Sequence, residues 1–197
     1  YAGSPVNSKQ LSGQNNIDAL LSEQPSDLSS TVVWANNPNY NSNSGITTVT
    51  YSFVPSSVSD QKFATTQSEP TPGIDQILEL SEVHKESVKL ALSEWAKVAK
   101  ISFVEIQETN DQAGTLRFGF TDYNELAANG DIAAAWAISP SSAPASGDIW
   151  LHHNSASDNY SQGTGYGFAT LIHEIGHALG LKHPFEGSQK LSSDLDK

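Results

Sequence analysis

The spacing of apolar residues predicts two long helices in this chain. Between residues 79 and 100 no proline or glycine occurs, and apolar side chains recur at Leu80, Val83, Val88, Leu92, Trp95 and Val98. This is the repeat expected of one face of an amphipathic helix. A second helix is expected over about residues 165–179, after a loop rich in glycine and serine.

Short runs of β-favouring residues between turn-forming residues predict strands. They occur at residues 47–54, 101–106, 115–120 and 148–151. Residues 133–138 are short and apolar, which leaves open an edge strand or a helical fragment. The economical architecture is an α+β fold, in which a mixed, mostly parallel twisted sheet of about five strands packs with the two helices.

Composition removes several classes of protein from consideration. The 197 residues carry 22 acidic and 10 basic side chains, a formal net charge of -12. This balance argues against nucleic acid and anionic membrane surfaces as partners, because both attract basic proteins. No apolar run approaches the roughly 18 residues of a membrane span. Cysteine is absent, so neither a disulfide nor a thiolate metal site is available.

The second predicted helix carries the informative motif, His173-Glu174-Ile175-Gly176-His177. On a helix, side chains four residues apart lie about 40° apart around the axis and about 6 Å along it. Two imidazoles in that relation can bind one metal ion. Glu174 lies about 100° round from His173, where it suits a general base acting on a water rather than a third ligand.

A third histidine, His183, follows six residues after His177. It can join the other two only if the helix ends between them. Gly180 supplies that end, since glycine readily adopts the left-handed conformation after a helix C-terminus, and Pro184 prevents a restart. Three histidines with an open fourth position are typical of catalytic zinc. The alternative is a buried amphipathic helix with incidental histidines, each of which needs a partner without metal.

This segment resembles the zinc signature of the metzincin endopeptidases. Pro184, Ile175 and the run Leu179-Gly180-Leu181 look like the serralysin branch. Weaker similarities to serralysins lie at residues 17–21, 49–53, 95–103 and 147–151. The resemblance implies a metzincin-like fold and a secreted, extracellular zinc endopeptidase with protein or peptide substrates.

The resemblance also implies the roles of several residues. His173, His177 and His183 are expected to bind Zn²⁺, with Glu174 as the general base. Substrate is expected to lie extended along the edge strand, at Ala133, Ala134, Ala135 and Trp136; the alternative is an ordinary core strand. Calcium is a further possible cofactor, with no site identified. A monomer is expected.

Three family features are missing from the sequence. There is no Met for a Met-turn, no Tyr after Tyr166, and no glycine- and aspartate-rich calcium-binding repeat. The alternative function is therefore a non-catalytic or latent zinc-binding fragment. The expected organisation is an N-terminal arm with a short helix over residues 1–30, a catalytic domain over 31–187, and a polar tail over 188–197. A start at Tyr1 reads as a processed product.

Two further groups of residues have weaker interpretations. His152 and His153, near Asp148 and Asp158, could form a second metal site, but surface or hydrogen-bonded histidines are the preferred reading. Glu186, just after Pro184, could approach the surroundings of the zinc, although no catalytic part is expected for it.

Overall fold

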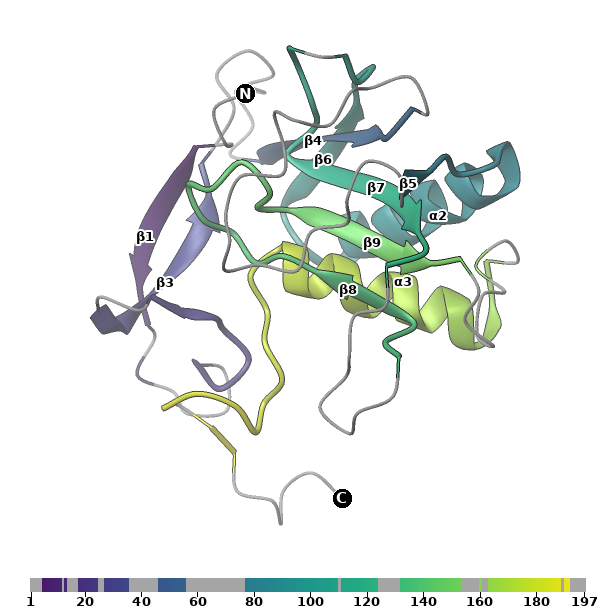
Figure 1. Cartoon of the computed structure of the whole chain (residues 1–197). Helices are drawn as coiled ribbons and strands as arrows, with labels where there is room; N and C mark the ends of the chain where they lie inside the picture. The colour runs from purple at the N-terminus through teal and green to yellow at the C-terminus, as the bar shows by residue number, and fades with distance from the viewer. Residues whose placement is uncertain are drawn as a thin grey trace.

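The computed structural model describes eleven stretches of the chain. They are residues 5–11, 13, 18–24, 27–35, 46–55, 77–109, 111–123, 132–153, 160, 163–188 and 190–191. Within them, two helices and a large sheet build the centre of the molecule, and a small second sheet lies at the N-terminal side (Figure 1).

The described part of the large sheet has six strands. In order across the sheet they are β6 (Ile101–Glu105), β4 (Thr47–Phe53), β7 (Leu116–Thr121), β9 (Asp148–His152) and β8 (Ala135–Ala137), with β5 (Ile77–Leu78) also beside β7. Strand β4 runs parallel to β6 and β7, and β7 runs parallel to β9. Strands β5 and β8 are antiparallel to their neighbours. The predicted mixed, mostly parallel sheet is therefore confirmed.

Helices α2 (Glu82–Val98) and α3 (Gly165–Ala178) share one hydrophobic core with the sheet and contact each other. Both predicted helices are thus present (Figure 1). Helix α2 begins three residues later than the sequence pattern suggested. The reason is tertiary: Ile77 and Leu78 pair with Phe120 and Thr121 as strand β5, so the chain is extended until just before the helix.

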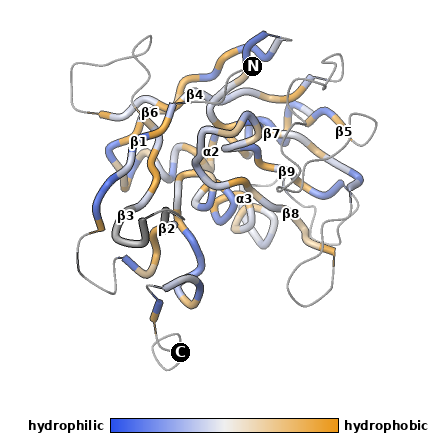
Figure 2. Tube along the Cα trace, turned by 60° about the vertical axis from the view of Figure 1, so that its left-hand side comes forward, coloured by the Kyte–Doolittle hydropathy of each residue, from blue (hydrophilic) through white to orange (hydrophobic). Residues whose placement is uncertain are grey.

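The two faces of the sheet differ in chemistry. Alternate side chains such as Tyr51, Phe118 and Ile149 belong to the core beneath the helices. Their neighbours on the opposite face include Ser52, Arg117 and Asp148, which are polar yet buried. Figure 2 shows hydrophobic and hydrophilic positions following one another along the strands. These polar residues depend on hydrogen bonds and ion pairs, whereas a second apolar cluster of Val54, Trp136 and Trp150 lies on the same side of the sheet.

Arg117 is the centre of this polar face. Its side chain is 2% exposed, and its Nη2 and Nε lie 2.7 and 2.8 Å from Glu108 Oε1. Its Nη1 lies 3.5 Å from Asp148 Oδ2. Ser52 Oγ donates to Glu108 Oε2 at 2.8 Å and accepts from Gly114 N at 2.8 Å. The cluster thus joins β4, β7 and β9 to the segment after β6.

The N-terminal region is more ordered than its sequence suggested. Strands β1 (Val6–Gln10), β3 (Asp27–Trp34) and β2 (Glu23–Gln24) form an antiparallel sheet in that order. The segment expected to be an N-terminal arm contains β1, which pairs with β3 from Val6–Trp34 to Gln10–Ser30. The side chains of β1 are mostly exposed, so backbone pairing rather than an apolar pattern makes it a strand.

The other N-terminal predictions are only partly covered. The short helix of the arm is expected over residues 16–21; residues 16 and 17 lie outside the described residues, and of the others Asp18 alone is helical, before a turn. Strand β3 runs across the predicted boundary at residues 30 and 31. The division into arm, domain and tail stays a prediction. Of the polar tail, only residues 188, 190 and 191 are described.

The short apolar segment at residues 133–138 contains an edge strand, not a helical fragment. Strand β8 pairs antiparallel with β9 through Ala135–Leu151, Trp136–Trp150 and Ala137–Ile149. It is last in the strand order, so its other edge has no neighbouring strand among the described residues. Helix α3 also contacts β8.

Tyr51 provides a test of the buried part of β4. Its hydroxyl donates to Glu105 Oε2 at 3.2 Å, and burial together with this carboxylate raises the pKa of Tyr51 to about 12. The unfolded chain loses this proton near pH 10 and the folded chain near pH 12, so folding stability falls as pH rises through that window. The wild-type chain should therefore lose folding free energy over this pH range, and Tyr51→Phe should not. Because solvent screening reduces the effect, the expected difference is about 1 kcal/mol. Urea unfolding of both proteins at pH 9 and 11.5 measures this difference. An equal change of unfolding free energy in the two proteins would contradict the prediction.

Candidate active site

Helix α3 is fixed in place by two tryptophans. Trp95 Nε1 donates to Ile172 O at 3.1 Å, and Trp34 Nε1 donates to Ala178 O at 2.8 Å. The first bond comes from α2 and the second from β3. A Cβ on Gly176 would lie 3.1 Å from the Trp95 ring, closer than most Cβ contacts. The glycine within the histidine motif therefore allows α2 and α3 to approach closely.

The end of α3 has the geometry predicted from Gly180. Gly180 has a φ of +105°, in the left-handed region. Its N–H donates to His177 O, and Leu181 N donates to Gly176 O, each at 2.9 Å. This pair of bonds is the Schellman arrangement that ends helices at a glycine. The chain then turns back and carries His183 towards the other two histidines.

The three predicted ligands converge. The Nε2 atoms of His173 and His177 lie 2.9 Å apart, and those of His173 and His183 lie 3.2 Å apart. Each offers one ligand atom, and these all lie within 4.8 Å of one another. Zinc–nitrogen bonds of about 2.0–2.1 Å in tetrahedral geometry place ligand nitrogens about 3.3 Å apart, so the spacing suits Zn²⁺.

In two of the histidines, a hydrogen bond at Nδ1 determines the tautomer and leaves the lone pair on Nε2. His177 Nδ1 donates to Leu181 O at 2.9 Å, since a carbonyl can only accept. His183 Nδ1 lies 2.9 Å from Glu186 Oε1, a carboxylate that accepts in the same way. Both Nε2 atoms are thus unprotonated in the neutral rings. Two such lone pairs near His173 Nε2 are the donors that one metal ion can use.

Electrostatics favour the same neutral state. Burial, followed by the neighbouring His177 and His183, lowers the pKa of His173. Burial is also the largest cause of the lowered pKa of His177. Metal binding needs deprotonated ligands, so these shifts prepare the rings for it.

Glu174 lies beside the histidines but is not one of the group that can hold the ion. Its side chain is 7% exposed, and burial raises its pKa to about 7 in the metal-free chain. A carboxylate with a pKa near the working pH is suited to proton transfer.

A pocket of about 350 Å³ opens between α3 and the segment that enters β8. One wall is formed by Ala133, Ala134 and Ala135. The other belongs to α3 and contains Tyr166, Ala169, Thr170, His173 and Glu174. Three of the four residues predicted to bind substrate therefore lie next to the predicted general base. Their role in binding stays a prediction.

Trp136 is not brought to this pocket. Successive side chains of a strand point to opposite faces, and Trp136 packs with Val54 and Trp150 on the side of the sheet away from the helices. It is 8% exposed and also makes an edge contact with Tyr123. The structure gives it a packing contact rather than a position beside the histidines.

A family model described as Matrixin (Peptidase_M10) matches residues 72–191, more than half of the chain. The chain belongs to this peptidase family. The match includes both long helices and all three converging histidines.

Individual relatives point to the serralysin branch of these metalloproteases. The chain is similar to Metalloprotease AprA of Pseudomonas entomophila, with 42% identity over 116 residues, 57% of this chain and 22% of that protein. It is 33% identical over 124 residues to Serralysin B of Dickeya chrysanthemi, covering 63% of this chain and 25% of that protein. A serralysin of Photorhabdus laumondii is 34% identical over 123 residues, 60% of this chain and 24% of that protein. The chain thus matches about a quarter of the length of these relatives. The predicted serralysin-like metzincin catalytic domain is confirmed.

Other histidines of this metzincin domain do not form a second metal group in the described residues. His152 is 4% exposed at the end of β9. His153 Nδ1 lies 3.7 Å from Asp122 Oδ1, and its ring contacts Phe120. Asp158, considered for the same site, lies outside the described residues. Among the residues that are described, His173, His177 and His183 are the one group found that could hold a metal ion.

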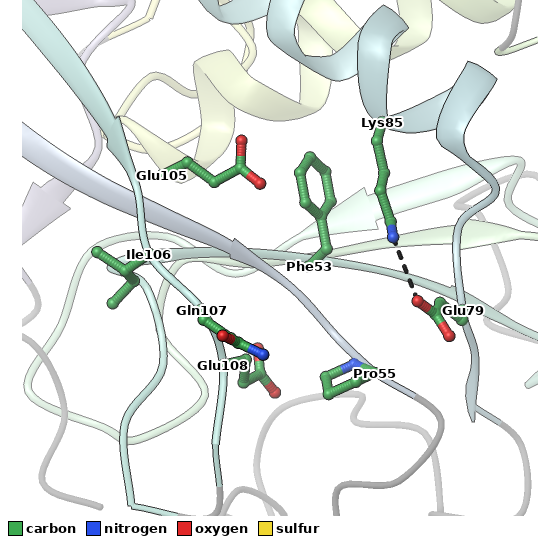
Figure 3. A pocket seen from close by; sticks show the side chains of 8 residues that line it. All are labelled: Phe53, Pro55, Glu79, Lys85, Glu105, Ile106, Gln107 and Glu108. Atoms are coloured by element: carbon green, nitrogen blue, oxygen red, sulfur yellow. Dashed lines mark hydrogen bonds and ion pairs between the residues drawn. The ribbon is translucent and has the colours of Figure 1, made fainter.

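A second cavity, of about 450 Å³, lies at the carboxyl ends of β4 and β6 (Figure 3). Its carboxylates are already engaged. Glu79 pairs with Lys85 at 3.2 Å, and Glu108 belongs to the Arg117 cluster. Glu105 accepts from Tyr51 and pairs with Lys89 at 3.3 Å. The carboxylates of this cavity therefore already form ion pairs or hydrogen bonds with other residues of the chain.

The contact between Glu186 and His183 agrees with the expectation that Glu186 could approach the surroundings of the three histidines. The available signal was its position three residues after the third histidine, followed by Gly187.

None of the described helices is long and apolar enough to cross a membrane.

Proposed function

We propose that this chain is the catalytic part of a secreted zinc-dependent endopeptidase with broad sequence tolerance. The observation that carries the proposal is the convergence of three histidine Nε2 atoms beside the buried Glu174, at the mouth of a pocket. A purely structural zinc site has no need of that carboxylate. Extracellular location is supported by the resemblance to serralysins.

His173, His177 and His183 would hold the zinc ion. When bound, zinc polarises the peptide carbonyl and lowers the pKa of a water from 15.7 to about 7. Glu174 accepts the proton of the attacking water and passes it to the nitrogen of the departing amine. The water oxygen forms the new bond to the carbonyl carbon, and the carbon–nitrogen bond breaks.

Substrate is proposed to lie extended along the free edge of β8. Pairing with a strand edge uses the substrate backbone, so it gives affinity without demanding a sequence. The small side chains of Ala133, Ala134 and Ala135 allow such an approach. Across the pocket, the small side chains of Ala169 and Thr170 lie opposite the alanine wall, and no lysine or arginine is among the lining residues.

We also propose that the chain acts as a monomer and that its substrates are proteins or peptides. A net charge of -12 is unsuited to nucleic acid. Calcium stays an expectation from the resemblance.

Removal of zinc by a strong chelator is expected to abolish cleavage of an unfolded protein substrate by this chain. Zinc added back should restore it, because the histidine group supplies the ligands. Gel analysis of a denatured substrate, with chelator, without it, and after zinc repletion, measures the effect. Zinc binding without cleavage would favour the alternative, a non-catalytic or latent zinc-binding fragment. Absence of zinc binding would contradict both functions.

A further inference from the structure

The segment that links His177 to His183 is held by the N-terminal part of the chain. Ser22 N donates to Gly180 O at 2.8 Å, and Lys182 N donates to Leu20 O at 2.9 Å. Leu21 and Leu181 form an antiparallel bridge between these bonds. Figure 1 shows the chain leaving α3 beside the N-terminal strands. A segment about 160 residues away in sequence therefore pairs with the turn between the second and third ligands.

Lys182 adds a side-chain link to this pairing. Its Nζ donates to Ala19 O at 2.7 Å and to Glu186 O at 2.6 Å. The first bond reaches the N-terminal segment, and the second reaches the turn just beyond His183. One ammonium group thus ties the segment before the third histidine, the segment after it and the N-terminal part together.

The same turn orients two of the three ligand rings. Leu181 O accepts from His177 Nδ1, and Glu186 Oε1 accepts from His183 Nδ1, each at 2.9 Å. Phe185 stacks against the His183 ring at 5.2 Å between centroids and 7° between planes. Groups that hold the outer nitrogen of a ligand histidine fix its tautomer and direction. The position of residues 181–186 therefore sets the position of the donors.

From these contacts we propose that Lys182 is a positioning residue for the metal centre, acting with residues 19–22. By holding Ala19 and Glu186, it keeps His183 in the ligating position before metal arrives. Less ordering is then left for the binding step, which raises affinity. This inference rests on the proposed function, because it takes the three histidines as the zinc site.

The zinc affinity of Lys182→Met distinguishes a purely electrostatic effect of Lys182 from a positioning effect. Removal of a positive charge close to a cation site should strengthen zinc binding by electrostatics alone. If Lys182 positions His183, its loss should weaken zinc binding about tenfold, the lower end of the range for residues that orient ligands. Lys182→Arg keeps the donors and should recover part of the affinity.

The zinc dissociation constant of the full chain is measured by competition with a chromophoric chelator, alongside the visible spectrum of the cobalt-substituted protein. Lys97→Met is the matched control, because it removes an equal charge from an exposed pair with Glu94 on α2. The expected result is weaker binding and an altered cobalt spectrum for Lys182→Met alone. Equal or tighter binding by a folded Lys182→Met protein overturns the proposal.

A second measurement needs no variant. Coupling between the two segments is reciprocal, so zinc should stabilise the pairing that supports its own site. Hydrogen exchange at the Ser22 and Lys182 amides of the wild-type chain should slow when zinc is added. Unchanged exchange at both amides overturns the proposal. Wild-type chain that binds no zinc contradicts the proposed function instead, and the two failures are distinguishable.

Discussion

Replacement of Glu174 by glutamine is expected to lower kcat/KM for peptide cleavage by at least about 10²–10⁴-fold while zinc stays bound. Glutamine has nearly the same shape but cannot accept the proton of the attacking water. Because burial already disfavours the charged carboxylate, a neutral amide at this position should not unfold the metal-free chain. A fluorogenic peptide assay measures the rate, and zinc stoichiometry on the same sample measures the metal.

Glu94→Gln is the matched control for this variant. Glu94 is an exposed carboxylate that pairs with Lys97 on α2, so its loss should leave cleavage unchanged. Cleavage by Glu174→Gln at the wild-type rate would show that the assigned proton transfer is wrong. Loss of both cleavage and zinc would place Glu174 in metal binding rather than in catalysis.

Replacement of Arg117 by methionine is expected to cost about 3–5 kcal/mol of folding free energy at neutral pH. Glu108 and Asp148 are 5% and 2% exposed, and Arg117 pairs with them at 2.7 and 3.5 Å. Without it, two buried carboxylates lose the charge that compensates them. Contact of the guanidinium with the Trp150 ring, 5.6 Å from its centroid, is lost as well. Urea unfolding of the metal-free chain at pH 7 measures the effect.

Lys97→Met is the control for this variant. Because it removes an equal charge from an exposed ion pair, it should change stability by no more than about 0.5 kcal/mol. An Arg117→Met protein as stable as wild type would mean that the cluster is not a major support of the sheet.

The histidine site was largely predictable because its determinants are local. Helical periodicity places His173, Glu174 and His177, and the conformational freedom of glycine ends the helix at Gly180. Both features depend on residues within one or two turns of one another. The packing of Trp95 on Gly176 was not evident from the sequence, because the two residues lie on different helices far apart in the chain. The periodicity of one helix carries no information about its contacts with the other.

The strands were predicted well where they are apolar and poorly where they are polar. Strand β4 and its parallel neighbours alternate under the helices, so the hydrophobic pattern identifies them. Strand β1 has mostly exposed side chains, and only its backbone bonds to β3 make it a strand. Such bonds are nearly independent of side-chain type and leave little trace in a sequence.

By itself, the sequence determined that this chain has two amphipathic helices, that the second ends at a glycine, and that three histidines and one glutamate share its end. Tertiary structure decided that Lys182 contacts Ala19 and Glu186, that Glu186 contacts His183, and that Trp136 packs away from the pocket. The physical reason is the range of the interactions. Periodicity and turn preferences act between near neighbours, whereas hydrogen bonds between distant segments exist only after the chain has folded.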